Sequence, residues 1–140
     1  MQNRDEINDQ IINQILQGYV ECALWLETDD NDRPLNENYS KGDLPRETKN
    51  RMRADCAQFY ELNMDLCDLW FARRTPEYTG HDFWLSRNGH GSGFWDRFMV
   101  SAGDSEEWEA LGRRLQAAAE RFGEAHLYIG ADGEIYYFAG

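Results

Sequence analysis

The sequence predicts an α+β domain in which three amphipathic helices cover a small antiparallel sheet of two hairpins. Apolar residues recur at helical spacing in three stretches, and two other stretches combine β-rich runs with glycine-containing turns. We expect helices over about 5–27, 44–71 and 105–122, and hairpins over about 81–97 and 126–138. The order is then α-α-β-β-α-β-β. A chain of 140 residues is long enough for one domain with its own core, residues 1–140.

A continuous apolar stripe predicts the first helix. Its residues recur every three or four positions: Ile7, Ile11, Ile15, Tyr19, Ala23 and Leu26. The helix is expected to end by Thr28, because the acidic segment from Asp29 to Asp43 follows and contains Pro34. This segment lacks the central glycine of an EF-hand calcium loop. We interpret it as a solvated loop, with a partner-facing acidic patch as the alternative.

Local start and stop signals delimit the second helix. Asp43 is a candidate N-cap, and Pro45 falls in the first turn, where proline is tolerated. Pro76 is expected to end the helix, because proline disfavours helical backbone at the residue before it, here Thr75.

The C-terminal third of the chain has equally local signals. Asp104 and Glu107 form a capping box for the third helix, and Gly123 is its expected stop. A β-rich run follows on each side of Asp132-Gly133, a dipeptide typical of tight hairpin turns. The sequence therefore predicts a helix followed by a hairpin.

Charge and cysteine content limit the classes of function. The formal net charge is -12, from 26 acidic and 14 basic residues. An acidic surface repels nucleic-acid backbones and anionic membranes and attracts basic partners. The odd set of Cys22, Cys56 and Cys67 contains no Cys-x-x-Cys pair and is typical of buried free thiols. With a polar N-terminus and no long apolar run, we expect a cytoplasmic protein that binds no membrane.

The stretch Gly80–Arg97 is the most distinctive of the chain. Phe83 and Leu85 alternate with Asp82, Trp84 and Ser86, a period typical of a strand. Asn88-Gly89 and Gly91-Ser92-Gly93 supply turn residues, so we predict a hairpin with a glycine-rich tip. Turn geometry explains its glycines and packing explains most of its aromatic residues. The candidate binding residues are Trp84, Arg87, His90, Trp95 and Arg97.

Catalytic chemistry is weakly supported in this stretch. His81, His90 and Asp96 are weak candidates for metal ligands, because no established metal-binding spacing connects them. Ser92 lies near His90, but the surrounding residues do not form a nucleophile elbow. We predict no catalytic residue and no cofactor, and keep a small metal-dependent hydrolase as a second alternative.

Two binding functions remain. The glycine-rich tip could present backbone N–H groups to phosphate, and the aromatic and arginine side chains could stack on bases. A nucleic-acid- or nucleotide-associated protein using residues 80–97 is therefore the first alternative. Protein recognition requires no missing group, and a hairpin with tryptophan, arginine and histidine has the composition of an interaction hot spot.

The chain resembles uncharacterised small acidic proteins of tailed bacteriophages and mobile elements. The most specific part is the motif DFWL-x-RNGHG-x-GFWDR within residues 81–97, and further similarity lies in residues 19–25, 34–39, 52–56 and 127–133. The resemblance implies an accessory protein made in the bacterial cytoplasm, and it implies no catalytic residue. We therefore expect a non-enzymatic binding protein that engages a host or phage protein with a basic surface. It would act as a host-defence inhibitor or an acidic nucleic-acid mimic.

Overall fold

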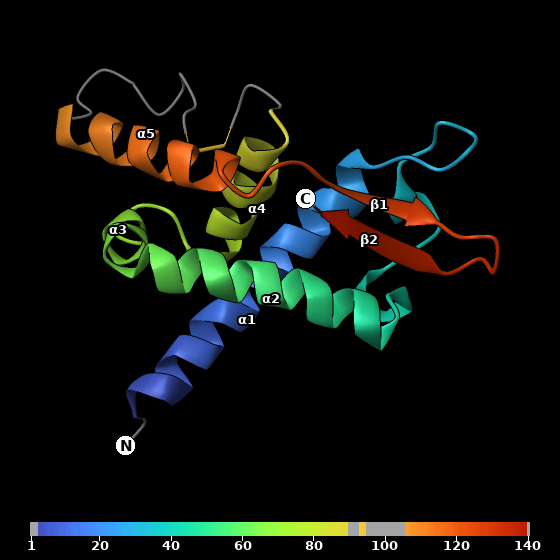
Figure 1. Ribbon diagram of the computed structural model, residues 1–140, viewed down its shortest axis with the longest axis horizontal. Coiled ribbons are helices and arrows are strands. Elements are labelled where there is room, and N and C mark those ends of the chain that lie inside the picture. Colours follow the sequence, from blue (N-terminus) through green and yellow to red (C-terminus); the bar gives the residue numbers. More distant parts are fainter. Residues whose placement is uncertain (1–2, 90–92, 95–105, 140) are drawn as a thin grey trace.

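The computed structural model describes residues 3–89, 93–94 and 106–139 (Figure 1). Within these residues the fold is α+β, as predicted, and mainly helical. The helices are α1 (Arg4–Leu26), α2 (Arg46–Leu62), α3 (Met64–Trp70), α4 (Pro76–Arg87) and α5 (Glu106–Glu120), with short 3-10 turns η1 (Leu35–Glu37) and η2 (Lys41–Asp43). The strands are β1 (Ala125–Ile129) and β2 (Ile135–Ala139), which form one antiparallel pair. The predicted three helices and the order α-α-β-β-α-β-β are wrong.

The main error concerns the predicted hairpin over 81–97, which begins inside helix α4. Thr75 caps this helix by accepting a hydrogen bond from the backbone N–H of Tyr78, and Pro76 occupies the first helical turn. Pro76 therefore starts a helix, whereas the preceding helix α3 already ends at Trp70. The buried positions Gly80, Phe83, Trp84 and Arg87 have helical spacing.

The predicted helix over 44–71 consists of two helices. Asn63 interrupts it with non-helical backbone angles, and its side-chain amide donates a hydrogen bond to the carbonyl oxygen of Phe59. Its start also differs from the prediction, because α2 begins at Arg46. Asp43 belongs instead to η2, where its carboxylate accepts a hydrogen bond from the backbone N–H of Ser40 at 2.7 Å.

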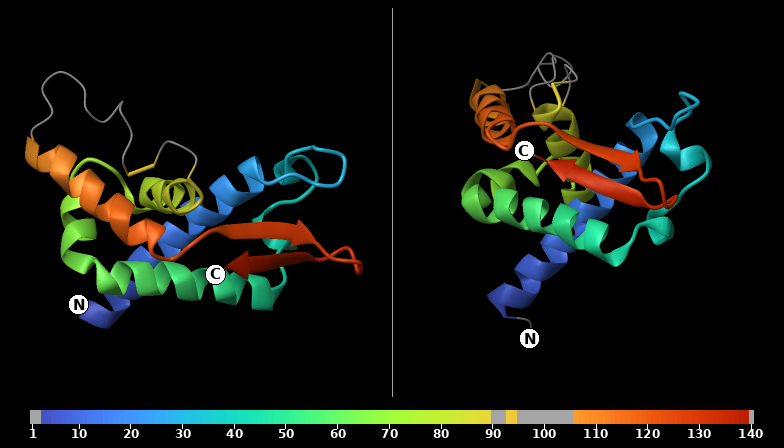
Figure 2. Two further views of the ribbon diagram at one scale, coloured as in Figure 1. Left: turned by 45° about the horizontal axis from the view of Figure 1, so that its top comes forward. Right: turned by 45° about the vertical axis from the view of Figure 1, so that its right-hand side comes forward.

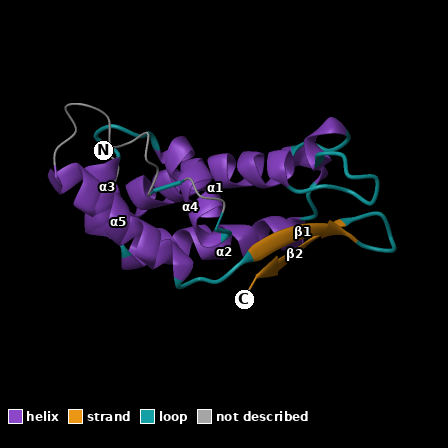
Figure 3. Ribbon diagram, turned by 90° about the horizontal axis from the view of Figure 1, so that it is seen from above, coloured by secondary structure: helices purple, strands orange, loops and turns teal. Residues whose placement is uncertain are grey.

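Helix α1 crosses α4 closely, and α4 also contacts α5 (Figures 1 and 2). Seen from above, α1 and α2 run along the length of the molecule, with the strands beside α2 (Figure 3). Stacked aromatic rings fill the space between these helices. Phe59 of α2 lies 4.2 Å from Phe83 of α4 between ring centroids, and Phe94 continues the stack at 5.5 Å.

Other elements predicted from local signals agree with the structure. The predicted helices over 5–27 and 105–122 correspond to α1 and α5, although the predicted N-cap Asp104 lies outside the described residues. The turn at Asp132-Gly133 is confirmed, with Gly133 at a φ of 80°. The three cysteines are free and buried, as predicted. Among the described residues, no helix is both long and apolar enough to cross a lipid bilayer.

Candidate functional site

The structure places two of the five predicted binding residues in the interior. The side chain of Trp84 has no exposed surface, and Arg87 is 4% exposed. His90, Trp95 and Arg97 lie outside the described residues, as does the candidate ligand Asp96. Neither Trp84 nor Arg87 is therefore available on the surface to a partner.

His81, the remaining candidate ligand, is partly exposed on α4. Its Nε2 lies 3.7 Å from a carboxylate oxygen of Glu21. Within the residues that the structure describes, no group of three or more histidine, cysteine, aspartate or glutamate side chains is arranged to hold a metal ion. Within the described part of the chain, Glu21 and His81 therefore form a pair that no third metal-ligating side chain joins.

Arg87 is the centre of a buried polar network. Its Nε donates to the carbonyl oxygen of Gly123 at 2.7 Å, and its Nη2 donates to that of Phe122 at 2.9 Å. Its Nη1 lies 3.0 Å from the Tyr19 hydroxyl and 3.1 Å from the Tyr137 hydroxyl. The guanidinium thus connects α1, α4, the segment after α5 and strand β2.

Asp55 of α2 balances the charge of Arg87. Its Oδ2 lies 3.0 Å from Arg87 Nη1 and accepts a hydrogen bond from the Tyr137 hydroxyl at 2.6 Å. Because Tyr137 donates to Asp55, the hydroxyl of Tyr19 must donate to Tyr137 across their 2.6 Å separation. The result is a continuous hydrogen-bonded chain from Tyr19 to Asp55.

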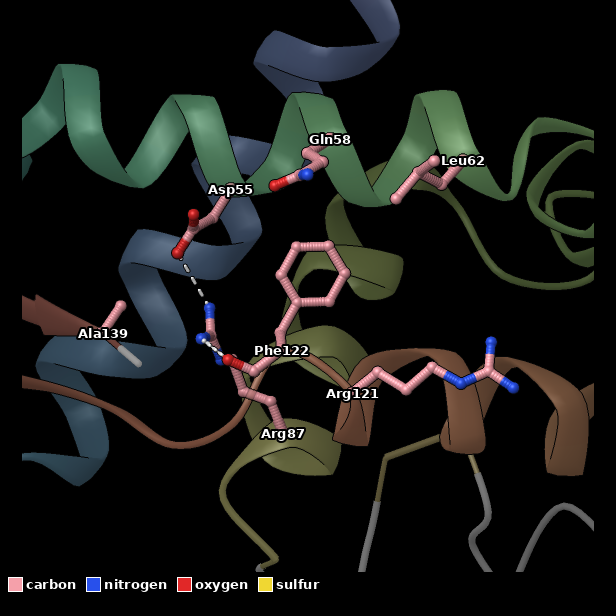
Figure 4. Close-up of a pocket in the computed structure, with 7 residues that line it drawn as sticks. All are labelled: Asp55, Gln58, Leu62, Arg87, Arg121, Phe122 and Ala139. Atoms are coloured by element: carbon pink, nitrogen blue, oxygen red, sulfur yellow. Dashed lines mark hydrogen bonds and ion pairs between the residues drawn. The ribbon is translucent and has the colours of Figure 1, made fainter.

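A hollow of about 380 Å³ opens next to this network (Figure 4). Asp55 lies at its edge with 24% of its side chain exposed, whereas the Arg87 side chain is 1% exposed. The other lining residues are Gln58, Leu62, Arg121, Phe122 and Ala139. The side chain of Asp55 is therefore much more accessible from this hollow than that of Arg87.

Three groups of the network, Tyr19, Tyr137 and Arg87, have pKa values that are raised from their ordinary values. Burial raises the pKa of Tyr19 and Tyr137 far above the ordinary tyrosine value, so both remain neutral. Burial alone would lower the pKa of Arg87, but the two tyrosines and Asp55 outweigh it and raise that pKa. Neither the two tyrosines nor Arg87 is therefore prepared to exchange a proton near neutral pH, and these three groups are suited to holding the fold rather than to acid–base catalysis.

A second buried carboxylate has a similar structural character. Asp82 of α4 accepts hydrogen bonds from Trp70 Nε1 at 3.1 Å and from both Nε and Nη2 of Arg74, at 3.0 and 2.9 Å. Burial raises the pKa of Asp82, and the hydrogen bonds from Arg74 oppose that shift. With these three donors the carboxylate joins α4 to the end of α3 and to Arg74 in the segment that follows it.

The clearest exposed feature is the outer side of the C-terminal hairpin. Strand register pairs His126 with Phe138 and Tyr128 with Tyr136, and all four side chains point away from the core. We call these four residues the aromatic face. Tyr128 is 51% exposed, Tyr136 37% and Phe138 60%. The rings of Tyr128 and Tyr136 are stacked, with centroids 5.7 Å apart.

Carboxylates border the aromatic face. A carboxylate oxygen of Glu27 lies within hydrogen-bond distance of His126 Nδ1, at 3.0 Å, and one of Glu124 lies 3.9 Å from His126 Nε2. At the turn, Asp132 accepts a hydrogen bond from the Tyr136 hydroxyl, which lowers the pKa of this carboxyl. The sequence from 122 to 140 contains three acidic residues and neither lysine nor arginine. The face is therefore aromatic with a negative border.

Sequence reasoning placed the hairpin correctly but not its exposed face. The available signal was the alternation of His126 and Tyr128 with apolar residues, repeated by Tyr136 and Phe138 in the second strand. Aromatic side chains in a strand usually indicate packing, and the sequence alone does not tell which side of a two-stranded sheet is covered.

Compared with family models, with curated proteins and with solved structures, the chain gives no match. Its own geometry is therefore the basis for assigning a function.

Proposed function

We propose that the protein is a non-enzymatic binding protein that engages a basic segment of another protein through the aromatic face. The observation that carries this proposal is the row of exposed Tyr128, Tyr136 and Phe138 beside carboxylates. Exposed aromatic side chains that polar residues surround have the composition of interaction hot spots. This location replaces the predicted one in residues 80–97, because Trp84 and Arg87 are buried.

The chemistry of the face favours a cationic occupant. Arginine and lysine bind over the faces of tyrosine and phenylalanine rings, and Glu124, Asp132 and Glu134 can pair with their charges. The net charge of -12 also accelerates the approach of a basic surface. The same carboxylates repel phosphate groups, which argues against nucleic acid as the occupant.

The identity of the partner follows from the resemblance and not from the geometry. A partner from the host bacterium or the phage, and a role as host-defence inhibitor or acidic nucleic-acid mimic, stay predictions. The proposed contact fits both roles, because proteins that bind nucleic acid carry basic surfaces.

The proposal is tested with three synthetic peptides in which arginine, lysine or glutamate alternates with glycine. We follow titrations at low salt by the amide NMR chemical shifts of the protein. The arginine peptide should bind and change the amide shifts of residues 126–138. Lysine should bind less tightly, because guanidinium stacks better on aromatic rings. The glutamate peptide should not bind.

Variants connect binding to the aromatic face. In the double variant Tyr128→Ser, Phe138→Ser, the affinity for the arginine peptide should fall about tenfold, because two ring contacts are lost. Trp25→Ser is the matched control, because Trp25 is 59% exposed on α1 and lies outside the face. Equal weakening by both variants, or shifts confined to other residues, would contradict the proposal.

A further inference from the structure

A groove between α1, η2 and α2 contains both lysines of the chain. Lys41 and Lys49 line it together with the carboxamides of Asn13 and Gln17, above Leu16 and Val20. Its volume is about 370 Å³, which is within the range of pockets for small molecules. None of its six lining residues borders the Asp55 hollow or belongs to the aromatic face.

The residues that line the groove include two lysines and no carboxylate, in a strongly acidic protein. The sequence has two lysines against 26 acidic residues, and both lysines lie here. Lys41 pairs with Glu21 at 3.1 Å, which leaves two of its three ammonium hydrogens for another acceptor. Among the described residues, no carboxylate lies within ion-pair distance of Lys49, which is exposed at the start of α2.

A neighbouring arginine fixes which end of Asn13 is available. Arg53 Nε donates to Asn13 Oδ1 at 2.9 Å, and Arg53 Nη2 lies 3.4 Å from Asp9. Because the amide oxygen of Asn13 is engaged, its NH₂ group is the part left for a ligand. The groove therefore offers two ammonium groups and an amide donor, a combination that complements an anion.

The floor of the groove is apolar. Leu16 is 9% exposed and Val20 is 2% exposed, and both belong to the core-facing side of α1. A short hydrocarbon group on a ligand could lie on the small surface that Leu16 still exposes and leave water itself, while the charged end of the ligand stays near the lysines.

We infer that this groove binds a small organic anion whose head is a carboxylate or phosphate monoester and whose body is a short apolar chain. Lys49 supplies the free cation, Lys41 the second one, and Asn13 a directed hydrogen bond. The inference is independent of the protein-binding function proposed above, since the two surfaces share no residue.

Four probes separate the parts of this inference: hexanoate, hexyl phosphate, inorganic phosphate and hexanol. In NMR titrations with millimolar probe, hexanoate or hexyl phosphate should change the amide chemical shifts of residues 13–20 and 41–49. Whichever of these two anions binds with the higher affinity identifies the preferred head group. Inorganic phosphate should bind more weakly, because it lacks the apolar body, and hexanol should not bind, because it lacks the charge.

Charge variants test the role of the lysines. In Lys49→Gln, the affinity for the more tightly bound organic anion should fall about tenfold, while Lys49→Arg should keep most of that affinity. Arg33→Gln removes the same charge from an exposed loop outside the groove and should leave the affinity unchanged. Because Lys49 is exposed, the melting temperature of Lys49→Gln should match that of the parent protein.

The inference is overturned by any of three results. These are no shift with either organic anion, equal binding of hexanol, and equal weakening by Arg33→Gln and Lys49→Gln. The last result would mean that only the overall charge of the protein matters.

Discussion

Gly18 of α1 and Gly80 of α4 lie where the two helices cross, and each faces the backbone of the other helix. A methyl group on Gly18 would lie 1.7 Å from the carbonyl oxygen of Glu77, and one on Gly80 would lie 2.0 Å from that of Ile15. Both distances are far shorter than a van der Waals contact. The two helices can therefore approach this closely only because neither residue has a side chain.

Gly80→Ala should destabilise the protein by at least about 2 kcal/mol, because overpacking outweighs the gain in helix propensity. The free energy of unfolding, from urea titration followed by circular dichroism, measures this effect. Gly42→Ala is the matched control, since a methyl group there would meet only the Ser40 hydroxyl at 3.7 Å. Equal stability of the Gly80→Ala and Gly42→Ala variants would show that the helices do not cross at these glycines.

This crossing also explains why α4 was not predicted from the sequence. Its buried side includes Gly80, Asp82 and Arg87, so the apolar residues alone do not show helical periodicity. Phe83 and Leu85 instead gave an apparent alternation typical of a strand. By contrast, α1, α5 and the C-terminal hairpin were predictable, because apolar spacing and turn residues specify them locally.

The polar network was beyond sequence reasoning for a different reason. Tyr19, Asp55, Arg87 and Tyr137 come from four separate elements and share no motif spacing. Arg87 was predicted to be a binding residue because tryptophan, arginine and histidine together give the predicted hairpin the composition of an interaction hot spot. Its burial became evident only when the helices and strand β2 were placed together.

Arg87→Met should destabilise the protein by about 3–5 kcal/mol, because Asp55 and two backbone carbonyls lose their buried cationic donor. Arg87→Lys should restore little of this, since one ammonium group cannot reach the five acceptors that the guanidinium contacts. Thermal unfolding of both variants tests this, with the exposed Arg33→Gln as control. A melting temperature of Arg87→Met close to that of the parent protein would contradict the network.

Thr75→Ala should weaken the start of α4 and cost about 1 kcal/mol of stability, because the N–H of Tyr78 loses its acceptor. Thr75→Ser keeps the hydroxyl and should be nearly neutral. Carbon chemical shifts of residues 76–87 provide an independent readout, since helical and extended backbones shift them in opposite directions. Extended values in the parent protein would favour the hairpin predicted from the sequence and exclude the helix.

Stability should fall steeply in alkaline solution because of the buried thiols. Burial raises the pKa of Cys56 and Cys67 well above the ordinary value of 9.0, and it raises that of Cys22 to about 12. Above pH 9 the unfolded chain loses these protons while the native protein retains them. The native state is therefore favoured fully below pH 9, and this advantage is lost as pH rises.

Each thiol should contribute a slope that approaches about 1.4 kcal/mol per pH unit once the unfolded thiol is mostly ionised, above about pH 10. Urea midpoints measured between pH 8 and 11 follow this increase in slope, and Cys22→Ala should reduce it by one thiol's share. Tyr19 and Tyr137, whose pKa values burial also raises, should steepen the loss further above pH 10. Native thiols that react readily with Ellman's reagent at pH 8, together with a flat pH profile, would contradict their burial.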